Sequence, residues 1–179
     1  KKLIFQGIEF GQWAEWNHSQ SLDWHLTRFA PHAGLSRLVQ HLNWIYRNEP
    51  AFYEQDDSYE GFDWIDFHDA DSSVWSFLRK PREGAQILVV VNATPIVRGG
   101  YRIGVSDPGW YEEILNTDAE TYGGSNCGNW AAARRNREWQ GNPWSIQVDL
   151  PPLAVSAFKR TPESIGSPAA RTAVDDPGA

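Results

Sequence analysis

Ser145-Ile146-Gln147-Val148-Asp149-Leu150 alternates polar and apolar side chains without a break. Successive side chains of a β-strand point to opposite faces of a sheet, so this alternation predicts a strand with one buried face and one face in water. Turn-forming residues bound the stretch on both sides, with Gly141-Asn142-Pro143 before it and Pro151-Pro152 after it. The stretch therefore predicts β-structure with short connections.

Short apolar stretches bounded by turn signals continue outward from this strand over residues 62–159. The turn signals are rich in Gly, Pro and Asp and lie at residues 69–71, 81–84, 99–100, 107–109 and 123–124. The expected strands are 62–67, 74–79, 87–92, 101–105, 110–116, 134–139, 145–150 and 154–159. About eight short strands separated by such turns are typical of two packed antiparallel sheets. We therefore predict an antiparallel β-sandwich for residues 56–160.

Residues 1–55 have a different pattern. Leu3-Ile4-Phe5 is a short apolar run of the kind that forms a strand buried on both faces of a parallel sheet. Apolar residues then recur at helical spacing and predict an amphipathic helix over residues 33–48, which Pro50 prevents from continuing. One strand, one long loop and one helix form a βα unit, as in the last unit of a (β/α)8 barrel. The predicted fold is therefore mainly β, with the sandwich preceded by the last βα unit of a barrel.

The loop after Leu3-Ile4-Phe5 carries the candidate binding residues, which are Glu9, Trp13, Glu15, Trp16 and Asn17. In a (β/α)8 barrel the loops that follow the strands build the active site. Carboxylates accept charge-assisted hydrogen bonds from sugar hydroxyls, and indole rings stack on the apolar faces of sugars. An alternative stays open, in which this loop is structural and packs against neighbouring barrel loops.

Composition excludes several classes of function. The net charge of −7 argues against a nucleic-acid partner, and no apolar run approaches the ~18 residues of a membrane helix. The single cysteine, Cys127, cannot form an intramolecular disulfide and suits a cytoplasmic location. The histidines lack metal-ligand spacing, so we expect neither a metal nor a cofactor.

Residues 161–179 are mostly small or polar, and this composition predicts a flexible tail.

Several stretches, in order along the chain, resemble branching enzymes of the α-amylase clan. Lys2-Leu3-Ile4-Phe5-Gln6-Gly7-Ile8-Glu9-Phe10-Gly11-Gln12-Trp13-Ala14-Glu15-Trp16-Asn17 resembles their eighth barrel strand and the loop that follows it. The most specific stretch is Leu115-Asn116-Thr117-Asp118-Ala119-Glu120-Thr121-Tyr122-Gly123-Gly124-Ser125, which resembles a signature of branching enzymes rather than of amylases at large. The family often has a second glycine where Ile8 stands, and residues 126–142 are a variable part of it.

The resemblance implies a parent glycogen branching enzyme that cleaves α-1,4-glucan chains. It transfers the cut chain to a glucose 6-hydroxyl and so forms an α-1,6 branch by a retaining double displacement. The resemblance places the catalytic carboxylates after the fourth, fifth and seventh barrel strands, and this chain begins at the eighth. We therefore expect no catalytic residue here, and no activity from the chain alone. The implied partners are linear and branched α-glucans (glycogen, amylose) and the missing N-terminal part of the catalytic barrel.

Two other functions remain open. In the first, the chain is a non-catalytic glucan-binding β-sandwich that uses some of its ten tryptophans to dock on glycogen. In the second, the parent is a trehalose-releasing hydrolase of the same clan, although the stretch 116–125 argues against this. Asp118 and Glu120 lie beside a Tyr-Gly-Gly turn, and we predict that they serve the turn rather than catalysis.

Overall fold

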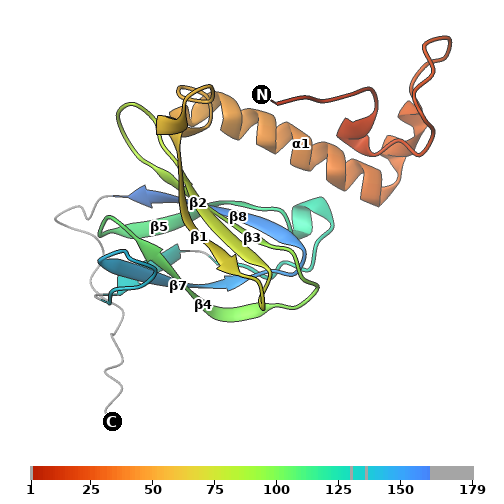
Figure 1. Cartoon of the computed structure of the whole chain (residues 1–179). Helices are drawn as coiled ribbons and strands as arrows, with labels where there is room; N and C mark the ends of the chain where they lie inside the picture. Colours follow the sequence, from red (N-terminus) through yellow and green to blue (C-terminus); the bar gives the residue numbers. More distant parts are fainter. Residues whose placement is uncertain (1, 130, 136, 162–179) are drawn as a thin grey trace.

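The computed structural model describes residues 2–129, 131–135 and 137–161 (Figure 1). Within these residues one α-helix, α1 (Ala30–Asn48), precedes the strands. The strands are β1 (Phe62–Asp69), β2 (Val74–Arg79), β3 (Ile87–Asn92), β4 (Arg98–Val105), β5 (Trp110–Asn116), β6 (Ala131–Arg135), β7 (Trp144–Leu150) and β8 (Ala154–Thr161). Short 3-10 turns are η1 (Ile8–Phe10), η2 (Trp24–Arg28), η3 (Pro50–Phe52), η4 (Tyr59–Gly61) and η5 (Glu120–Tyr122).

The strands form two packed antiparallel sheets. The ladder runs in the order β1-β2-β3-β8-β5-β6-β7-β4, and every pairing in it is antiparallel. Strand β6 pairs with β5 in one sheet and with β7 in the other, so it joins the two sheets. The core between them consists of buried apolar side chains from both sheets: Val74, Leu88, Val90, Ile103, Val105, Tyr111, Ile146, Val148, Leu150 and Phe158. The predicted antiparallel sandwich is confirmed.

Strand β3 is buried on both faces, which explains why Ile87-Leu88-Val89-Val90-Val91 is apolar throughout. Leu88 and Val90 point into the core between the sheets. Ile87 and Val89 point the other way, into a second core with Ile45 of α1. Helix α1 therefore covers the outer face of one sheet (Figure 1).

Helix α1 confirms the predicted helix and starts three residues earlier than its predicted first residue, at Ala30. Pro31 lies in its first turn, where a missing backbone N–H removes no helical hydrogen bond. At the other end the Glu49 N–H donates to the Ile45 carbonyl, and Pro50 ends the helix as predicted.

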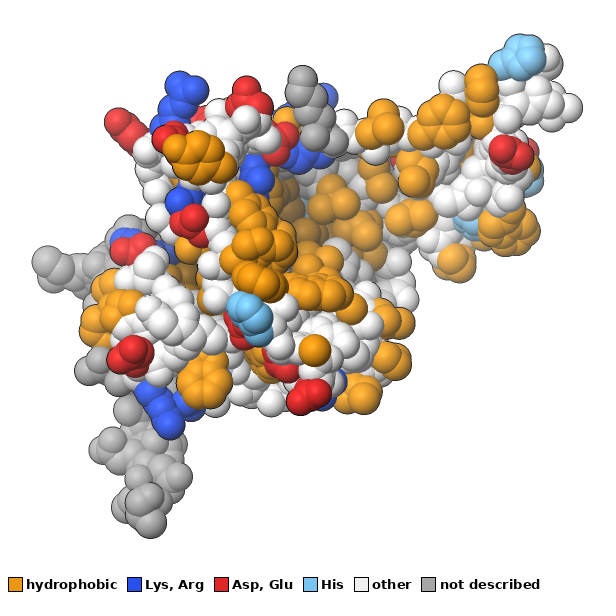
Figure 2. All heavy atoms as spheres, in the orientation of Figure 1, with side chains coloured by type: hydrophobic (Ala, Val, Ile, Leu, Met, Phe, Trp, Pro, Cys, Tyr) orange, Lys and Arg blue, Asp and Glu red, His pale blue; other side chains and the backbone are white. Residues whose placement is uncertain are grey.

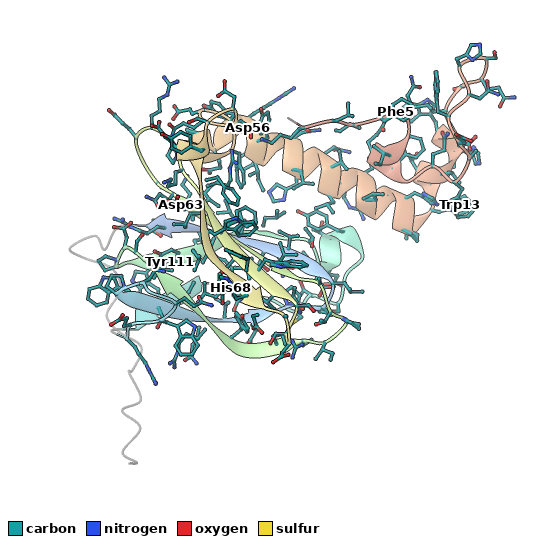
Figure 3. The ribbon with its side chains drawn as sticks, in the orientation of Figure 1. Phe5, Trp13, Asp56, Asp63, His68 and Tyr111 are labelled. Atoms are coloured by element: carbon teal, nitrogen blue, oxygen red, sulfur yellow. The ribbon has the colours of Figure 1, made fainter. Side chains whose placement is uncertain are left out.

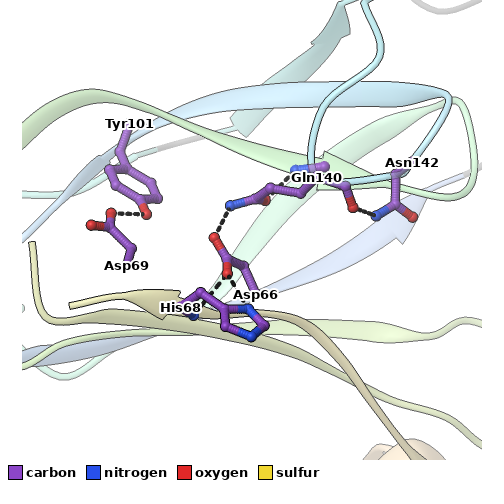
Figure 4. A network of polar contacts seen from close by, with 7 residues as sticks. Asp66, His68, Asp69, Tyr101, Gln140 and Asn142 are labelled. Carbon is purple, nitrogen blue, oxygen red and sulfur yellow. Dashed lines mark hydrogen bonds and ion pairs between the residues drawn. The ribbon is translucent and has the colours of Figure 1, made fainter.

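Polar side chains close the side of the sandwich opposite β6, where β1 and β4 are the free ends of the ladder (Figure 4). The Tyr101 hydroxyl donates to Asp69 Oδ2 at 2.7 Å. Gln140 Nε2 donates to Asp66 Oδ2 at 2.6 Å, while Gln140 Oε1 accepts the Gly104 N–H at 3.0 Å. These contacts join β1 to β4 through side chains.

The strand expected at Leu3-Ile4-Phe5 does not form. These residues lie in extended chain that runs along α1 toward its N-terminal end, starting from Lys2, which donates to the Phe52 carbonyl just beyond the C-terminal end of the helix (Figure 1). The surfaces of Leu3, Ile4 and Phe5 are 85%, 48% and 54% exposed. An apolar run becomes a strand only where another strand accepts its backbone hydrogen bonds, and none of the described strands pairs with it.

Two further expectations were wrong in detail. Gly99-Gly100, expected as a turn, lies within β4 at a register shift, where Gly100 has φ +62° and its N–H donates to Asp149 Oδ1 at 2.7 Å. The strand expected at 134–139 is β6, which ends at Arg135, and Trp139 instead pairs with Asn142 in an isolated bridge. Of the expected tail, Thr161 ends β8, and residues 162–179 lie outside the described part of the chain.

Candidate functional site: an aromatic loop on the N-terminal end of α1

The candidate residues lie in the segment 7–17, which we call the site loop. Gly7 and Gly11 have φ +88° and +68° and flank the turn η1. This left-handed backbone suits glycine, which has no Cβ to collide with its own chain. The Gln12 N–H closes the turn on the Gly7 carbonyl at 2.9 Å, and Glu9 Oε2 accepts the Gly7 N–H at 2.9 Å. The Glu9 carboxylate therefore holds the loop backbone.

Gln12 connects the site loop to the next segment. Its Oε1 accepts the Asp23 N–H at 2.8 Å, and its Nε2 donates to the Ala14 carbonyl at 3.0 Å. Asn17 is also engaged locally, because its Oδ1 accepts the Ser19 N–H at 3.0 Å. One glutamate and one asparagine of the predicted set thus shape the loop itself.

Helix α1 carries the site loop on its first turns. The buried ring of His32 donates from Nδ1 to the Phe10 carbonyl at 2.8 Å, because a carbonyl oxygen can only accept. Phe10 is itself buried and contacts the ring of Trp24, with centroids 4.9 Å apart. His32 was not among the predicted site residues. It supports the site loop through its hydrogen bond to Phe10, and no local sequence pattern indicates this contact between residues 22 positions apart.

Trp13 and Trp16 present indole surface to solvent. Trp13 is 82% exposed and contacts the His32 ring at an interplanar angle of 61°, with centroids 5.2 Å apart. Trp16 is 41% exposed and packs edge-on against Phe5, with centroids 5.6 Å apart. Glu15 lies exposed between them in sequence. Figure 3 shows Phe5 and Trp13 toward the N-terminal end of α1, away from the sandwich. We call the described residues before the sandwich, 2–55, which include α1, the arm.

The predicted residues therefore divide into two groups. Glu9 and Asn17 hold the backbone, whereas Trp13, Glu15 and Trp16 offer two ring surfaces and one carboxylate to a ligand. Rings and a carboxylate suit a sugar, since rings stack on its apolar faces and a carboxylate accepts from its hydroxyls.

A second aromatic surface lies over β1 and β2, beneath the helical arm (Figure 2). Its exposed members are Trp64, Phe67 and Trp75. Trp64 meets Phe62 and Phe77 at 86° and 78°, with centroids 4.9 and 5.8 Å apart. Because these rings pack edge to face against one another, they form a cluster rather than a flat platform.

Asp118 and Glu120 have different surroundings in the structure. Asp118 accepts hydrogen bonds from the Ser125 N–H at 3.0 Å, the Ser125 hydroxyl at 2.5 Å and the Cys127 N–H at 3.3 Å. Glu120 is exposed in the first turn of η5. The prediction that Asp118 serves the turn is confirmed. Burial and nearby carboxylates raise the pKa of the Cys127 thiol, which opposes thiolate reactivity.

Residues 2–129, 131–135 and 137–161 contain neither a metal site nor a membrane-spanning helix. No three His, Cys, Asp or Glu side chains in these ranges gather closely enough to hold a metal ion. Nor is any helix in these ranges both long and apolar enough to span a bilayer.

The fold places the chain among two-sheet antiparallel β-sandwich domains with a helix packed on one face. More particularly, residues 64–161 match the family described as "Alpha amylase, C-terminal all-beta domain". The chain belongs to this family.

Curated relatives extend the similarity to the arm. The chain is 50% identical over 161 residues to the 1,4-alpha-glucan branching enzyme GlgB of Aquifex aeolicus, a match that covers 89% of this chain and 26% of that protein. It is 49% identical over 160 residues to GlgB of Pseudomonas fluorescens, covering 89% of this chain and 22% of that protein. The resemblance to branching enzymes is thereby confirmed, and the chain spans about a quarter of the relatives' length.

Among solved structures, the crystal structure of alpha-amylase from H. orenii covers 71% of this chain and 20% of its own, with 13% identity and a TM-score of 0.44.

Proposed function

We propose that this chain is part of a 1,4-α-glucan branching enzyme of the cytoplasm, acting on glycogen and amylose. The observation that carries the proposal is the identity of about half of all aligned residues with enzymes of that name. The parent would cleave an α-1,4 bond, hold the cut chain on a carboxylate and transfer it to a glucose 6-hydroxyl. Its catalytic carboxylates lie outside this chain.

Within that enzyme the arm would complete the catalytic (β/α)8 barrel. Leu3, Ile4 and Phe5 are apolar and exposed, a costly state that pairing with a neighbouring barrel strand would relieve. The site loop follows them directly, so it would lie at the end of the barrel where the loops meet substrate. The proposed division is residues 1–55 for the barrel end and 56–160 for the β-domain.

We further propose that Trp13, Glu15 and Trp16 form a wall of the glucan groove. Trp13 exposes most of its surface while one contact with the His32 ring, at 61°, holds it, and a contact with Phe5 at 73° holds Trp16. Rings held in this way lose little side-chain entropy when a sugar stacks on them. Glu9 and Asn17 would act behind this wall by holding its backbone.

Product analysis tests the activity. The longer protein that contains this chain is incubated with amylose, and the anomeric protons of the product are recorded by NMR. New α-1,6 linkages are expected, and none from the 179-residue chain alone. Release of trehalose by the longer protein would instead favour a hydrolase of the same clan.

Affinity electrophoresis in glycogen tests the wall. Trp16→Ala in the longer protein should weaken retardation, because it removes a stacking surface. Trp110→Ala is the matched control, since Trp110 on β5 is also 41% exposed but lies in the sandwich. Equal loss in both variants would oppose a specific wall. Retardation of the 179-residue chain that depends on Trp64 and not on Trp16 would favour the glucan-binding sandwich.

A further inference from the structure

The stretch that most resembles branching enzymes carries no part of the proposed glucan wall, and its contacts give it another role. We call residues 116–127, which contain η5, the support loop. Its interior is fixed by side chains: Asn116 Oδ1 accepts the Asp118 N–H at 2.9 Å and Asn116 Nδ2 donates to the Cys127 carbonyl at 2.7 Å. The three hydrogen bonds accepted by Asp118 close the same turn.

The support loop is fastened to the sandwich. The Thr117 N–H donates to the Val155 carbonyl at 3.0 Å, and Thr117 Oγ1 accepts the Val155 N–H at 2.9 Å. Val155 belongs to β8, a central strand of its sheet. The loop therefore projects from a rigid base.

The tip of the support loop meets α1 from Gly34 in its first turns to His41 just past its midpoint. Arg37 Nε donates to the Thr121 carbonyl at 2.7 Å, and the Tyr122 hydroxyl hydrogen-bonds with His41 Nδ1. Gly34 approaches so closely that a Cβ there would lie 2.1 Å from the Tyr122 carbonyl oxygen. In Figure 1 the η5 turn lies directly beneath α1.

The rest of the sandwich holds α1 from its middle to its other end. Leu38 in the middle of the helix packs against the second core, Ile45 belongs to that core, and Glu49 pairs with Lys159 of β8. The first turns of α1, in contrast, carry the site loop through the contacts of His32 with Phe10 and Trp13. The support loop is therefore the contact with the sandwich nearest to the site loop.

We infer that the support loop is a positioning element: it props the N-terminal half of α1 and thereby fixes the site loop relative to the sandwich. Asp118 and Tyr122 are its positioning residues, and they act through α1 without touching a ligand. The identity of the ligand as glucan rests on the proposed function, whereas the positioning itself does not.

Hydrogen exchange resolved along the 179-residue chain tests the inference. In Asp118→Ala the amides of residues 7–12 and of the N-terminal half of α1 should exchange faster by about tenfold or more, as expected for a local opening made easier. The C-terminal half of α1 and the central strands should keep their rates. Asp69→Ala is the matched control, because Asp69 also caps a sandwich turn, at the Ser72 N–H, but lies away from α1.

A second variant approaches the same contact from the helix. Arg37→Ala removes the donor to Thr121 and leaves the sandwich untouched, so it keeps the test valid if Asp118→Ala fails to fold. It should accelerate exchange in residues 7–12, and the double variant should show less than the product of the two single effects. Unchanged rates at residues 7–12 in both single variants, or equal acceleration in Asp69→Ala, would overturn the inference.

A kinetic measurement separates positioning from ligand identity. In the longer protein Arg37→Ala should raise KM for amylose several-fold with little change in kcat. If exchange at residues 7–12 responds and KM does not, the positioning stands and the assignment of the site loop to glucan fails.

Discussion

Glu49 and Lys159 are 110 residues apart in the sequence and form an ion pair in which both carboxylate oxygens lie within 2.9 Å of the ammonium nitrogen. Glu49 caps the C-terminal end of α1, and Lys159 lies on β8. The carboxylate is mostly buried whereas the ammonium is partly exposed. The pair therefore joins the C-terminal end of α1 to the sandwich, and its negative charge, on Glu49, is largely removed from solvent.

Lys159→Met should lower the free energy of unfolding. The substitution keeps most of the apolar stem but leaves the buried Glu49 carboxylate unpaired, which costs about 1–2 kcal/mol after allowance for the exposed partner. Urea unfolding at pH 7 measures the change. Lys80→Met is the control, because the partner of Lys80, Asp63, is exposed, and a loss there as large as at Lys159 would contradict the role of burial.

The Asp69–Tyr101 contact should make stability depend on acid pH. The Tyr101 hydroxyl, aided by the Ser72 N–H, lowers the pKa of Asp69 despite partial burial. The unfolded carboxyl therefore takes up its proton at higher pH than the folded one, so the contribution of Asp69 is complete above about pH 5 and is lost as pH falls below about 4. Asp69→Asn should destabilise the chain by about 1–2 kcal/mol at pH 7 and progressively less below pH 4.

Urea titrations between pH 2 and pH 7 give this difference directly. Asp71→Asn, at an exposed position of the same turn, should show no such pH-dependent difference. A constant gap between Asp69→Asn and the unaltered chain across the whole range would show that the carboxylate charge is unimportant there.

Gly34→Ala should weaken the attachment of α1 although alanine is the better helix former. The gain in helix propensity is about 1 kcal/mol at most. The new Cβ, however, would lie 2.1 Å from the Tyr122 carbonyl oxygen, so helix and support loop must separate. A lower thermal midpoint is expected, whereas Asn43→Ala on the exposed side of α1 should be neutral or slightly stabilising. A midpoint raised by Gly34→Ala would refute the close packing.

Leu3, Ile4 and Phe5 should exchange their amide hydrogens rapidly in the 179-residue chain, because no described strand pairs with them. In the longer protein the same amides should be strongly protected if they form a barrel strand. Mass spectrometry after pulse labelling of both proteins makes the comparison. Strong protection in the short chain would mean that the arm already has a partner for this segment.

Much of the sandwich could be predicted because its signals are local. The alternation in Ser145-Ile146-Gln147-Val148-Asp149-Leu150 reports one buried face, and β7 forms over this stretch and Trp144. The unbroken apolar run of β3 has a different cause, burial under α1 as well as in the core. Leu3-Ile4-Phe5 has the same kind of pattern and forms no strand, since pairing depends on residues distant in sequence.

Among the sequence signals, glycine was the least reliable indicator of where turns lie. Gly99-Gly100 carries the usual turn signal, yet Gly100 stays in β4 because a carboxylate from β7, Asp149, accepts its N–H. In the site loop, residue type alone identified the exposed rings of Trp13 and Trp16. Residue type could not show that the Glu9 carboxylate accepts a backbone hydrogen bond from its own loop. Nor could it show that His32 hydrogen-bonds to the carbonyl of Phe10, 22 residues away in the sequence.

The two sides of the sandwich are held together by different kinds of contact, because among the described strands the ladder passes from one sheet to the other only through β6. Separating the sheets at β6 must break backbone pairing with β5 or β7. Separating them at β1 and β4 breaks the side-chain hydrogen bonds of Asp66 and Asp69 and leaves the backbone ladder whole. The two sheets are thus joined by backbone pairing at β6 but by side-chain hydrogen bonds, including that of Arg98 to the Ser72 carbonyl, on the side of β1 and β4, where they can separate without loss of a backbone pair.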